Sequence, residues 1–299
     1  MDVKFQHKIN SAKDFEARGK VLHAIQIYQS LIEEFPEIPE SYIQLSNIFQ
    51  STGKTKSAEN IIRSIYELQP DNYELTLYYS QLLMQNESWD KAVKLLLDLI
   101  EGDPFAEYLT GYCYYKKKEF ELAKVHFLKF VKSGEEPELV HEAYFILAKI
   151  EYELEHYEDA LKHAKKAELI FNDDWELYLV YAKIYYKFSM YTHSYDSIKK
   201  GFKINDNISI LHKWAGKVNL KLNNFTSAKE HLQKYIDIKG KVTSDDYSLL
   251  AETCILCDDL NNALLYFNLA LNSNPENKLA IKGRAKIIKM IGDNAASDF

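Results

Sequence analysis

Two cysteines three positions apart, Cys254 and Cys257, have the spacing of a redox pair or of half a zinc site. The pair falls late in an expected helix, whereas a reactive thiol needs a helix N-terminus or a nearby cation to lower its pKa. A structural zinc needs four ligands, and the chain has one further cysteine, Cys113. We therefore expect both cysteines to be small packing residues, and we predict no metal site.

The other ionisable residues do not form a catalytic pattern. The nine histidines include no H-E-x-x-H motif. Acidic pairs such as Asp173-Asp174 and Asp245-Asp246 fall near expected helix ends, where a carboxylate complements the helix dipole. No glycine-rich phosphate loop is present in the sequence. We predict no catalytic residues, no cofactor and no enzymatic activity.

The composition favours helices joined by short turns, because the 299 residues include only 10 glycines and 6 prolines. A formal charge of −7 argues against general binding to nucleic acid, which needs a basic surface. Residues 1–20 lack the apolar core of a signal peptide, and no apolar run reaches the roughly 20 residues that span a bilayer. Three cysteines, an odd number, indicate a reducing compartment, so we expect a cytoplasmic protein without membrane insertion.

Residues 144–164 have the pattern of two short helices. Residues 144–154 place apolar side chains at spacings of three, four and seven, which lie on one face of a helix. Residues 157–164 repeat that pattern, and Glu155 and His156 leave room for a tight turn. One hairpin cannot bury both of its apolar sides, so this stretch predicts a stack of similar units.

Two residue types follow a common period along the chain. Pro36, Pro70 and Pro104 are spaced by 34 residues, and a series of small residues keeps the same period before its intervals vary between 31 and 37. Such regularity indicates an internal repeat. The small residues are Ala24, Ala58, Ala92, Ala123, Ala160, Ser194, Ala228 and Ala263.

This pattern resembles the tetratricopeptide repeat, a 34-residue helical hairpin with W-x2-L-G-x2-Y, then A-x3-F, then a late proline. Glu151 and Asn219 depart from it, because the family usually has an aromatic residue there. The resemblance covers residues 5–276, with repeats that start near residues 5, 39, 73, 104, 141, 175, 209 and 244. The second repeat carries the motif as Tyr42, Leu45, Ser46, Phe49, Ala58 and Pro70.

The resemblance implies an all-α fold, a right-handed superhelical solenoid of about eight helical hairpins over residues 5–276. Small residues are expected where the two helices of a hairpin approach most closely. Residues 277–291 predict one more helix that caps the last hairpin, with lysines and an arginine on its outer side. We expect residues 292–299 to form a disordered tail.

In this family the first helix of each hairpin lines a concave groove. Transferring that register places Lys149, Lys183 and Lys217 at one inward position of three successive repeats, and Trp214 lies between Lys213 and Lys217 in the sequence. The predicted groove is therefore basic and aromatic although the chain is acidic. Its predicted residues are Tyr112, Lys116, Phe145, Lys149, Tyr152, Lys183, Tyr186, Lys187, Lys213, Trp214, Lys217 and Lys221.

Two interpretations of this face stay open. Lysines on any solvated helix face need no ligand, and tyrosines there can simply pack against the next repeat. Alternatively, the lysines attract an acidic segment of a partner while the tyrosines supply rigid contact area. On the second interpretation the chain is a non-enzymatic scaffold or adaptor for protein–protein interaction, and reversing Lys149, Lys183 and Lys217 to glutamate abolishes binding of an acidic peptide.

Two further functions remain as alternatives. Lysines interleaved with aromatic residues also suit single-stranded RNA, although the acidic charge of the chain opposes it. Self-assembly through exposed terminal repeats is the other, because no segment before Phe5 has the pattern of a cap. We therefore expect a monomer or a weak homodimer.

Overall fold

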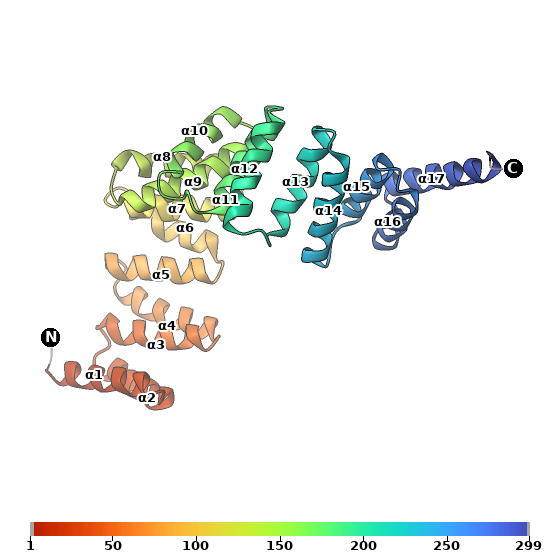
Figure 1. Cartoon of the computed structure of the whole chain (residues 1–299). Helices are drawn as coiled ribbons and strands as arrows, with labels where there is room; N and C mark the ends of the chain where they lie inside the picture. The colour runs from red at the N-terminus through yellow and green to blue at the C-terminus, as the bar shows by residue number, and fades with distance from the viewer. Residues whose placement is uncertain (1–2, 298–299) are drawn as a thin grey trace. The chain divides into compact units, whose positions relative to one another are not determined.

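The computed structural model describes the backbone of residues 3–297 and the side chains of residues 3–290. This part of the chain is entirely helical apart from its turns, which confirms the predicted all-α fold of helical hairpins (Figure 1). The helices are α1 (Val3–Ala17), α2 (Val21–Glu34), α3 (Pro39–Ser51), α4 (Thr55–Leu68), α5 (Tyr73–Gln85), α6 (Trp89–Leu97), α7 (Pro104–Lys116), α8 (Phe120–Ser133), α9 (Pro137–Glu153), α10 (Tyr157–Ala167), α11 (Trp175–Lys187), α12 (Tyr191–Ile204), α13 (Ser209–Lys221), α14 (Phe225–Lys239), α15 (Ser244–Leu256), α16 (Leu260–Ser273) and α17 (Lys278–Ser297).

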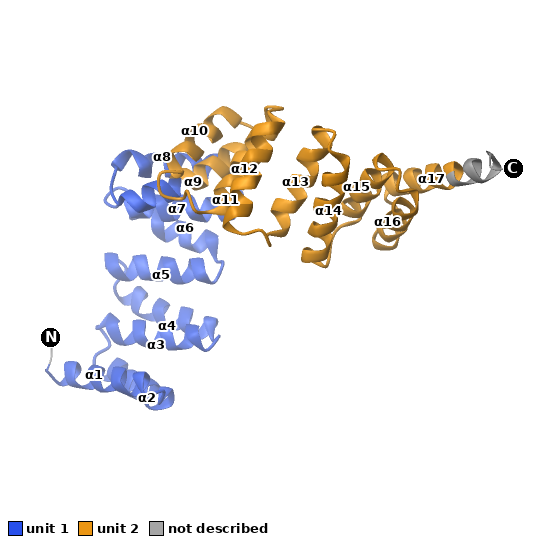
Figure 2. Ribbon diagram, viewed as in Figure 1, with its two compact units in different colours: residues 1–143 blue, residues 144–299 orange. Residues whose placement is uncertain are grey.

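The helices divide into two compact units, residues 1–143 and residues 144–299, and the division falls within α9 (Figure 2). In the first unit α1 packs on α2, α3 on α4, α5 on α6 and α7 on α8. In the second unit the hairpins α11–α12, α13–α14 and α15–α16 follow α10, and α17 packs on α16. Each unit is thus a stack of antiparallel helix pairs.

The small-residue series lies at the contacts between paired helices. All eight of its side chains, from Ala24 to Ala263, have no solvent exposure. Ser194 fits among the alanines because its hydroxyl donates to the carbonyl oxygen of Ala182 at 2.7 Å. A polar atom at this crossing is therefore hydrogen-bonded, which removes the cost of its burial.

The two departures from the family pattern stay buried as polar residues. Glu151 is 1% exposed, and its carboxylate lies 2.9 Å from Nδ1 of His156 in the following turn. Asn219 is also 1% exposed, donates to the carbonyl of Ala215 at 2.9 Å and accepts from the side chain of Asn224. Glu151 is paired with the turn that follows its helix, and Asn219 with its own helix and the following turn, so each hairpin keeps its packing without an aromatic residue.

The turns inside the eight hairpins share one backbone conformation. One residue in each has a positive φ, between 56° and 75°. This left-handed conformation reverses the chain after the first helix. Glycine adopts it without steric cost in the first two hairpins, whereas other residue types adopt it in the remaining six. The residues are Gly19, Gly53, Glu87, Lys118, Glu155, Ser189, Asn223 and Asp258.

The C-terminal helix α17 is longer than the sequence predicted. We expected a capping helix over 277–291 and a disordered tail over 292–299, but α17 continues through residue 297. The last two residues of the predicted tail lie outside the described residues.

The described residues contain neither a membrane-spanning helix nor a cluster of metal ligands. None of the helices there is both long enough and apolar enough to cross a membrane. No group of three or more histidine, cysteine, aspartate and glutamate side chains in the same part of the chain is arranged to hold a metal ion. Cys254 is buried, and this burial raises the pKa of its thiol to about 11, as expected for a packing residue.

Candidate functional site

Ten of the twelve residues predicted for the groove belong to the second unit, where they lie on the helices α9, α11 and α13. Tyr112 and Lys116 lie on α7 in the first unit. There they line a separate hollow of about 590 Å³. Its other lining residues are Gln81, Met84, Gln85, Glu87 and Trp89.

Trp214 is the centre of the predicted site in the second unit. The Nζ of Lys217 lies 5.0 Å from a ring centroid of Trp214, and the Nζ of Lys183 lies 5.8 Å from it. Tyr186 packs edge-on against the indole with ring centroids 5.5 Å apart. Lys183 also lies 5.7 Å from the ring of Tyr152, so it occupies the space between two aromatic side chains. These distances are those of cation–π contacts, which hold an ammonium group without neutralising its charge.

The two lysines beside Trp214 are partly buried and have no carboxylate of residues 3–290 in direct contact. Neither Lys183 nor Lys217 has an ion pair within the described residues. Burial lowers the pKa of Lys183 and the charge of Lys149 lowers it further, which outweighs the opposite effect of Glu153 and Glu176. Burial also lowers the pKa of Lys217, and repulsion from Lys213 and Lys183 lowers it further, which outweighs the opposite effect of Asp246. An anion bound between them would relieve both effects.

Lys149 and Lys213 are different, because each already has a carboxylate partner. The Nζ of Lys149 lies 2.5 Å from Glu176 and 4.0 Å from the ring centroid of Phe145. The Nζ of Lys213 lies 2.5 Å from Asp246, a residue that is only 6% exposed. Burial alone would raise the pKa of Asp246, but hydrogen bonds from Lys213 and Thr243 outweigh it and lower this pKa. Lys213 is therefore part of an internal ion pair.

The remaining predicted lysines are exposed at the margin. Lys187 lies 5.3 Å from the ring centroid of Tyr157, and its contact with the hydroxyl of Tyr157 raises the pKa of the lysine. Lys221 is exposed and lines a hollow beside Trp214. Both lysines remain accessible to a ligand at the edge of the site.

A hollow of about 380 Å³ adjoins the indole of Trp214. Its walls are mostly apolar, with two lysines and one carboxylate, and burial raises the pKa of that carboxylate, Glu252. The hollow has the size and character to take one apolar side chain of a partner. It is lined by Tyr186, Trp214, Lys217, Leu220, Lys221, Leu249, Glu252, Thr253 and Leu256.

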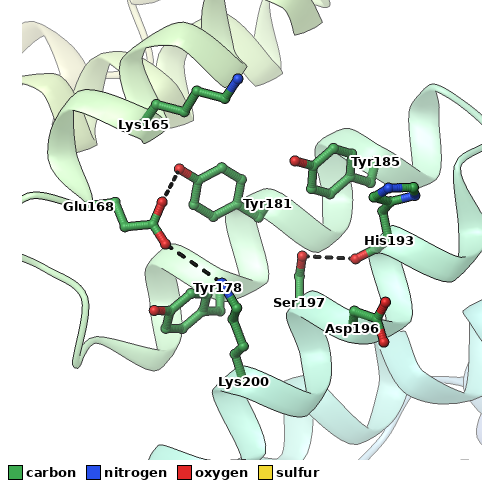
Figure 3. Close-up of a pocket in the computed structure, with 9 residues that line it drawn as sticks. All are labelled: Lys165, Glu168, Tyr178, Tyr181, Tyr185, His193, Asp196, Ser197 and Lys200. Carbon is green, nitrogen blue, oxygen red and sulfur yellow. Dashed lines mark hydrogen bonds and ion pairs between the residues drawn. The ribbon is translucent and has the colours of Figure 1, made fainter.

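A second hollow in this unit, of about 210 Å³, was not anticipated from the sequence. Figure 3 shows it between the end of α10, one side of α11 and α12. Tyr181 donates to Glu168 at 2.8 Å, and Lys200 lies 3.8 Å from the same carboxylate (Figure 3). Its lining residues are Lys165, Glu168, Tyr178, Tyr181, Tyr185, His193, Asp196, Ser197 and Lys200.

The sequence does contain a signal for this second hollow. Tyr178, Tyr181 and Tyr185 recur at spacings of three and four, which places them on one face of α11. Tyr181 and Lys183 are two residues apart on that helix, so their side chains point to opposite sides. The repeat pattern assigns these tyrosines to packing between helices, and for that reason the hollow between them was missed.

The repeated hairpins match known proteins. A family model described as tetratricopeptide repeat matches residues 51–112. The chain has the tetratricopeptide repeat fold, and residues 51–112 match the family itself. Comparison with curated proteins gives no significant match.

Solved structures with the tetratricopeptide repeat fold resemble the chain at low sequence identity. A tetratricopeptide repeat protein from Parabacteroides merdae superposes with a TM-score of 0.60 and 16% identity, covering 87% of this chain and 98% of that one. A chain of the APC/C hetero-tetramer Cut9-Hcn1 gives a TM-score of 0.60 at 11% identity and covers 89% of this chain. The match spans only 52% of that chain, and likeness at this level concerns the fold alone.

A third structural relative is shorter. The MamA RS-1 ArsTM double mutant superposes with a TM-score of 0.51 and 17% identity over 56% of this chain and 93% of its own. Tetratricopeptide repeats serve in general as scaffolds for protein interaction, usually without enzymatic activity. The tetratricopeptide repeat fold of the chain supports that general class of function.

Proposed function

We propose that the second unit binds an acidic segment of a partner protein across α11 and α13, with Trp214 as the central contact. The observation that carries this proposal is the pair of lysines, Lys183 and Lys217, that flank the indole without an ion-pair partner in the described part of the chain. Carboxylates placed beside them would gain attraction in a half-buried setting, where charges are less screened than in water.

The neighbouring hollow completes the proposed site. An apolar side chain of the segment enters between Trp214, Leu249 and Leu256, while acidic residues on either side of it reach the two lysines. Charge attraction then speeds the encounter, and the aromatic contacts slow dissociation. Glu252 in the same hollow disfavours a continuous run of phosphates, so this site suits a peptide better than single-stranded RNA.

A labelled peptide with one leucine between glutamates is the direct probe of the proposal. We expect it to bind the full chain, and the variant Lys183→Glu/Lys217→Glu to bind at least ten times more weakly, a loss of about 1.4 kcal/mol or more. Adding Lys149→Glu to this variant changes less, because Lys149 is already paired with Glu176. Fluorescence anisotropy at constant ionic strength measures all three affinities.

Lys162→Glu/Lys199→Glu is the matched control, because it changes the charge of the unit by as much as the test variant. Both lysines are exposed, on α10 and α12, and pair with Asp159 at 2.9 Å and Asp196 at 2.6 Å, so nothing changes at Trp214. Equal affinity of the wild type and the double variant would refute the proposal. Tight binding of an oligouridine that displaces the peptide would favour the RNA alternative instead.

A further inference from the structure

Helix α17 occupies the place of the first helix of a ninth hairpin. Ile281, Ala285 and Ile288 lie 34 positions after Tyr247, Ala251 and Cys254 of α15. In α15 this face packs against the second helix of its hairpin, α16. In the described residues α17 has no second helix after it.

The corresponding face of α17 is open to solvent. Ile281 is 47% exposed and Ile288 is 51% exposed, and Ala285 between them is exposed as well. In contrast, Ala251 and Cys254 of α15 have no exposure. The small residue at the centre of the exposed face is the type that lets a second helix approach closely in each of the eight hairpins.

The opposite side of α17 is firmly attached to the second unit. Ala280 and Ile287 are completely buried in the core of the last hairpin. Gly283 lies so close to Phe267 that a Cβ atom there would be 2.1 Å from Cζ of the ring. Asn277 accepts from the backbone N–H groups of two α17 residues and donates to Ser244 at 2.7 Å. The orientation of the exposed face is therefore fixed by packing.

The charge of α17 indicates what can cover this face. Residues 278–290 contain five basic side chains and no acidic one, in a chain whose formal charge is −7. No ion pair connects these five to an acidic side chain of the described residues. Pairing of α17 with α17 of a second copy would place like charges together, which is unfavourable. The basic side chains are Lys278, Lys282, Arg284, Lys286 and Lys289.

We propose that α17 is half of a hairpin that an acidic, amphipathic helix of a partner protein completes. The partner helix packs a small residue against Ala285 and large apolar residues against Ile281 and Ile288, as the second helices of the other hairpins do. Its carboxylates face the basic side chains beside this strip. The strip is narrow and has a small residue at its centre, so it fits the ridge of a helix better than the broad surface of a membrane.

A synthetic helical peptide tests this proposal on the full chain. The peptide has alanine at the crossing position, leucine four and seven residues later, and glutamates on its flanks. We expect binding in anisotropy measurements and at least a tenfold loss of affinity in Ile281→Asp/Ile288→Asp. Both isoleucines are half exposed, and circular dichroism checks that this variant keeps its helices. A peptide with the same composition in scrambled order should not bind.

Two controls separate this site from other surfaces. Leu169→Asp replaces an apolar residue of the same unit that is 73% exposed and follows α10, far along the chain from α17. This variant should bind the helical peptide like the wild type. The variant Lys183→Glu/Lys217→Glu should also bind it normally, because the site at Trp214 is not involved. If the leucine–glutamate peptide does not bind, the proposal for the Trp214 site fails but the proposal for α17 is unaffected. If the helical peptide does not bind, only the proposal for α17 fails.

Three outcomes would overturn the proposal. The first is no binding of the helical peptide, or equal binding by the isoleucine variant. The second is concentration-dependent self-association in sedimentation that the isoleucine variant abolishes, which would assign the face to a second copy of the chain. The third is binding to anionic phosphatidylserine vesicles that depends on Ile281 and Ile288 without binding of the peptide, which would assign it to a membrane surface.

Discussion

At the scale of single residues, the buried His212 on α13 pairs with the partly buried His231 on α14. Their Nδ1 atoms are 3.0 Å apart, and Nε2 of His212 lies 2.9 Å from the carbonyl oxygen of Asp206. Because that carbonyl can only accept, His212 carries its proton on Nε2 and accepts from Nδ1–H of His231. Protonating Nδ1 of His212 would bring two N–H groups face to face. The arrangement therefore requires His212 to be neutral, and a proton added to His231 would have to go on its Nε2.

This pair makes the stability of the second unit depend on pH. Burial lowers the pKa of His231 from 6.5 to about 4, with a further contribution from His212. Between these two values the unfolded chain binds more protons than the folded one, so stability falls as the pH falls from 6.5 towards 4. Since His231 is only partly buried, we expect a loss of about 1 kcal/mol, or ~2–4 °C in Tm.

Thermal unfolding from pH 7 to pH 4.5 tests this expectation. The variant His231→Gln keeps a donor for His212 and cannot be protonated, so its Tm should decline less over this interval. His193→Gln on α12 is the control, because it removes an imidazole from the same unit outside the pair. Parallel decline of all three proteins would show that the pair does not titrate as described.

The lysines show how far residue types predict a site. The sequence places Lys149, Lys183 and Lys217 at one position of three successive repeats, but it does not reveal what each Nζ contacts. Glu176 neutralises Lys149 from the next repeat, whereas Lys183 and Lys217 lie against Trp214. Such contacts depend on side-chain directions across neighbouring helices, which a register alone does not specify. The prediction of Trp214 as the central contact remains to be tested.

At the scale of elements, the cap of α17 determines how this helix is held. Asn277 is 7% exposed and connects α17 to α15 through its side-chain amide. Replacing it with alanine removes the cap and leaves Ser244 and Ser248 with fewer partners, so Asn277→Ala should cost about 1–2 kcal/mol. The loss should concentrate in α17.

Hydrogen exchange measures this effect helix by helix. In Asn277→Ala the backbone amides of α17 should exchange faster, while those of α11 and α13 keep their protection. Asn274→Ala is a suitable control, because the side chain of Asn274 is exposed and accepts only from Glu276 at 3.1 Å. Unchanged exchange in α17 would mean that the buried face alone holds the helix.

The helices and hairpins were largely predictable because each depends on local chemistry. Small residues at one position and prolines between repeats predicted the 34-residue period. The spacing of apolar residues predicted which face of each helix is buried. The continuation of α17 to residue 297 was not predicted, since the expectation of a frayed end came from its position in the chain. The exposure of Ile281 and Ile288 was not predicted either, because residues at these positions of the other repeats pack against a second helix.

At the scale of the whole molecule, the division into two compact units predicts two separable unfolding events. Gly216 on α13 lies against Leu232, whose Cγ would be 2.5 Å from a new Cβ atom. Overpacking there outweighs the better helix propensity of alanine, so Gly216→Ala should destabilise the second unit by about 1–2 kcal/mol. The first unit should keep its stability.

The three tryptophans report on the units separately, because Trp89 lies in the first and Trp175 and Trp214 lie in the second. With Trp89 replaced by phenylalanine, Gly216→Ala should lower the urea midpoint of the fluorescence change. With Trp89 as the sole tryptophan, the midpoint should not move. A common shift in both backgrounds would mean that the chain unfolds as one cooperative body.

The left-handed turn residue that recurs in all eight hairpins also bears on how the chain folds during synthesis. Each turn brings together two helices that are adjacent in the sequence, so most contacts form between residues that are close along the chain. Closing such short loops costs little conformational entropy. A hairpin can therefore close soon after its second helix leaves the ribosome and then serve as a template for the next. On this route each hairpin packs on the one made before it, and α17 packs on α16.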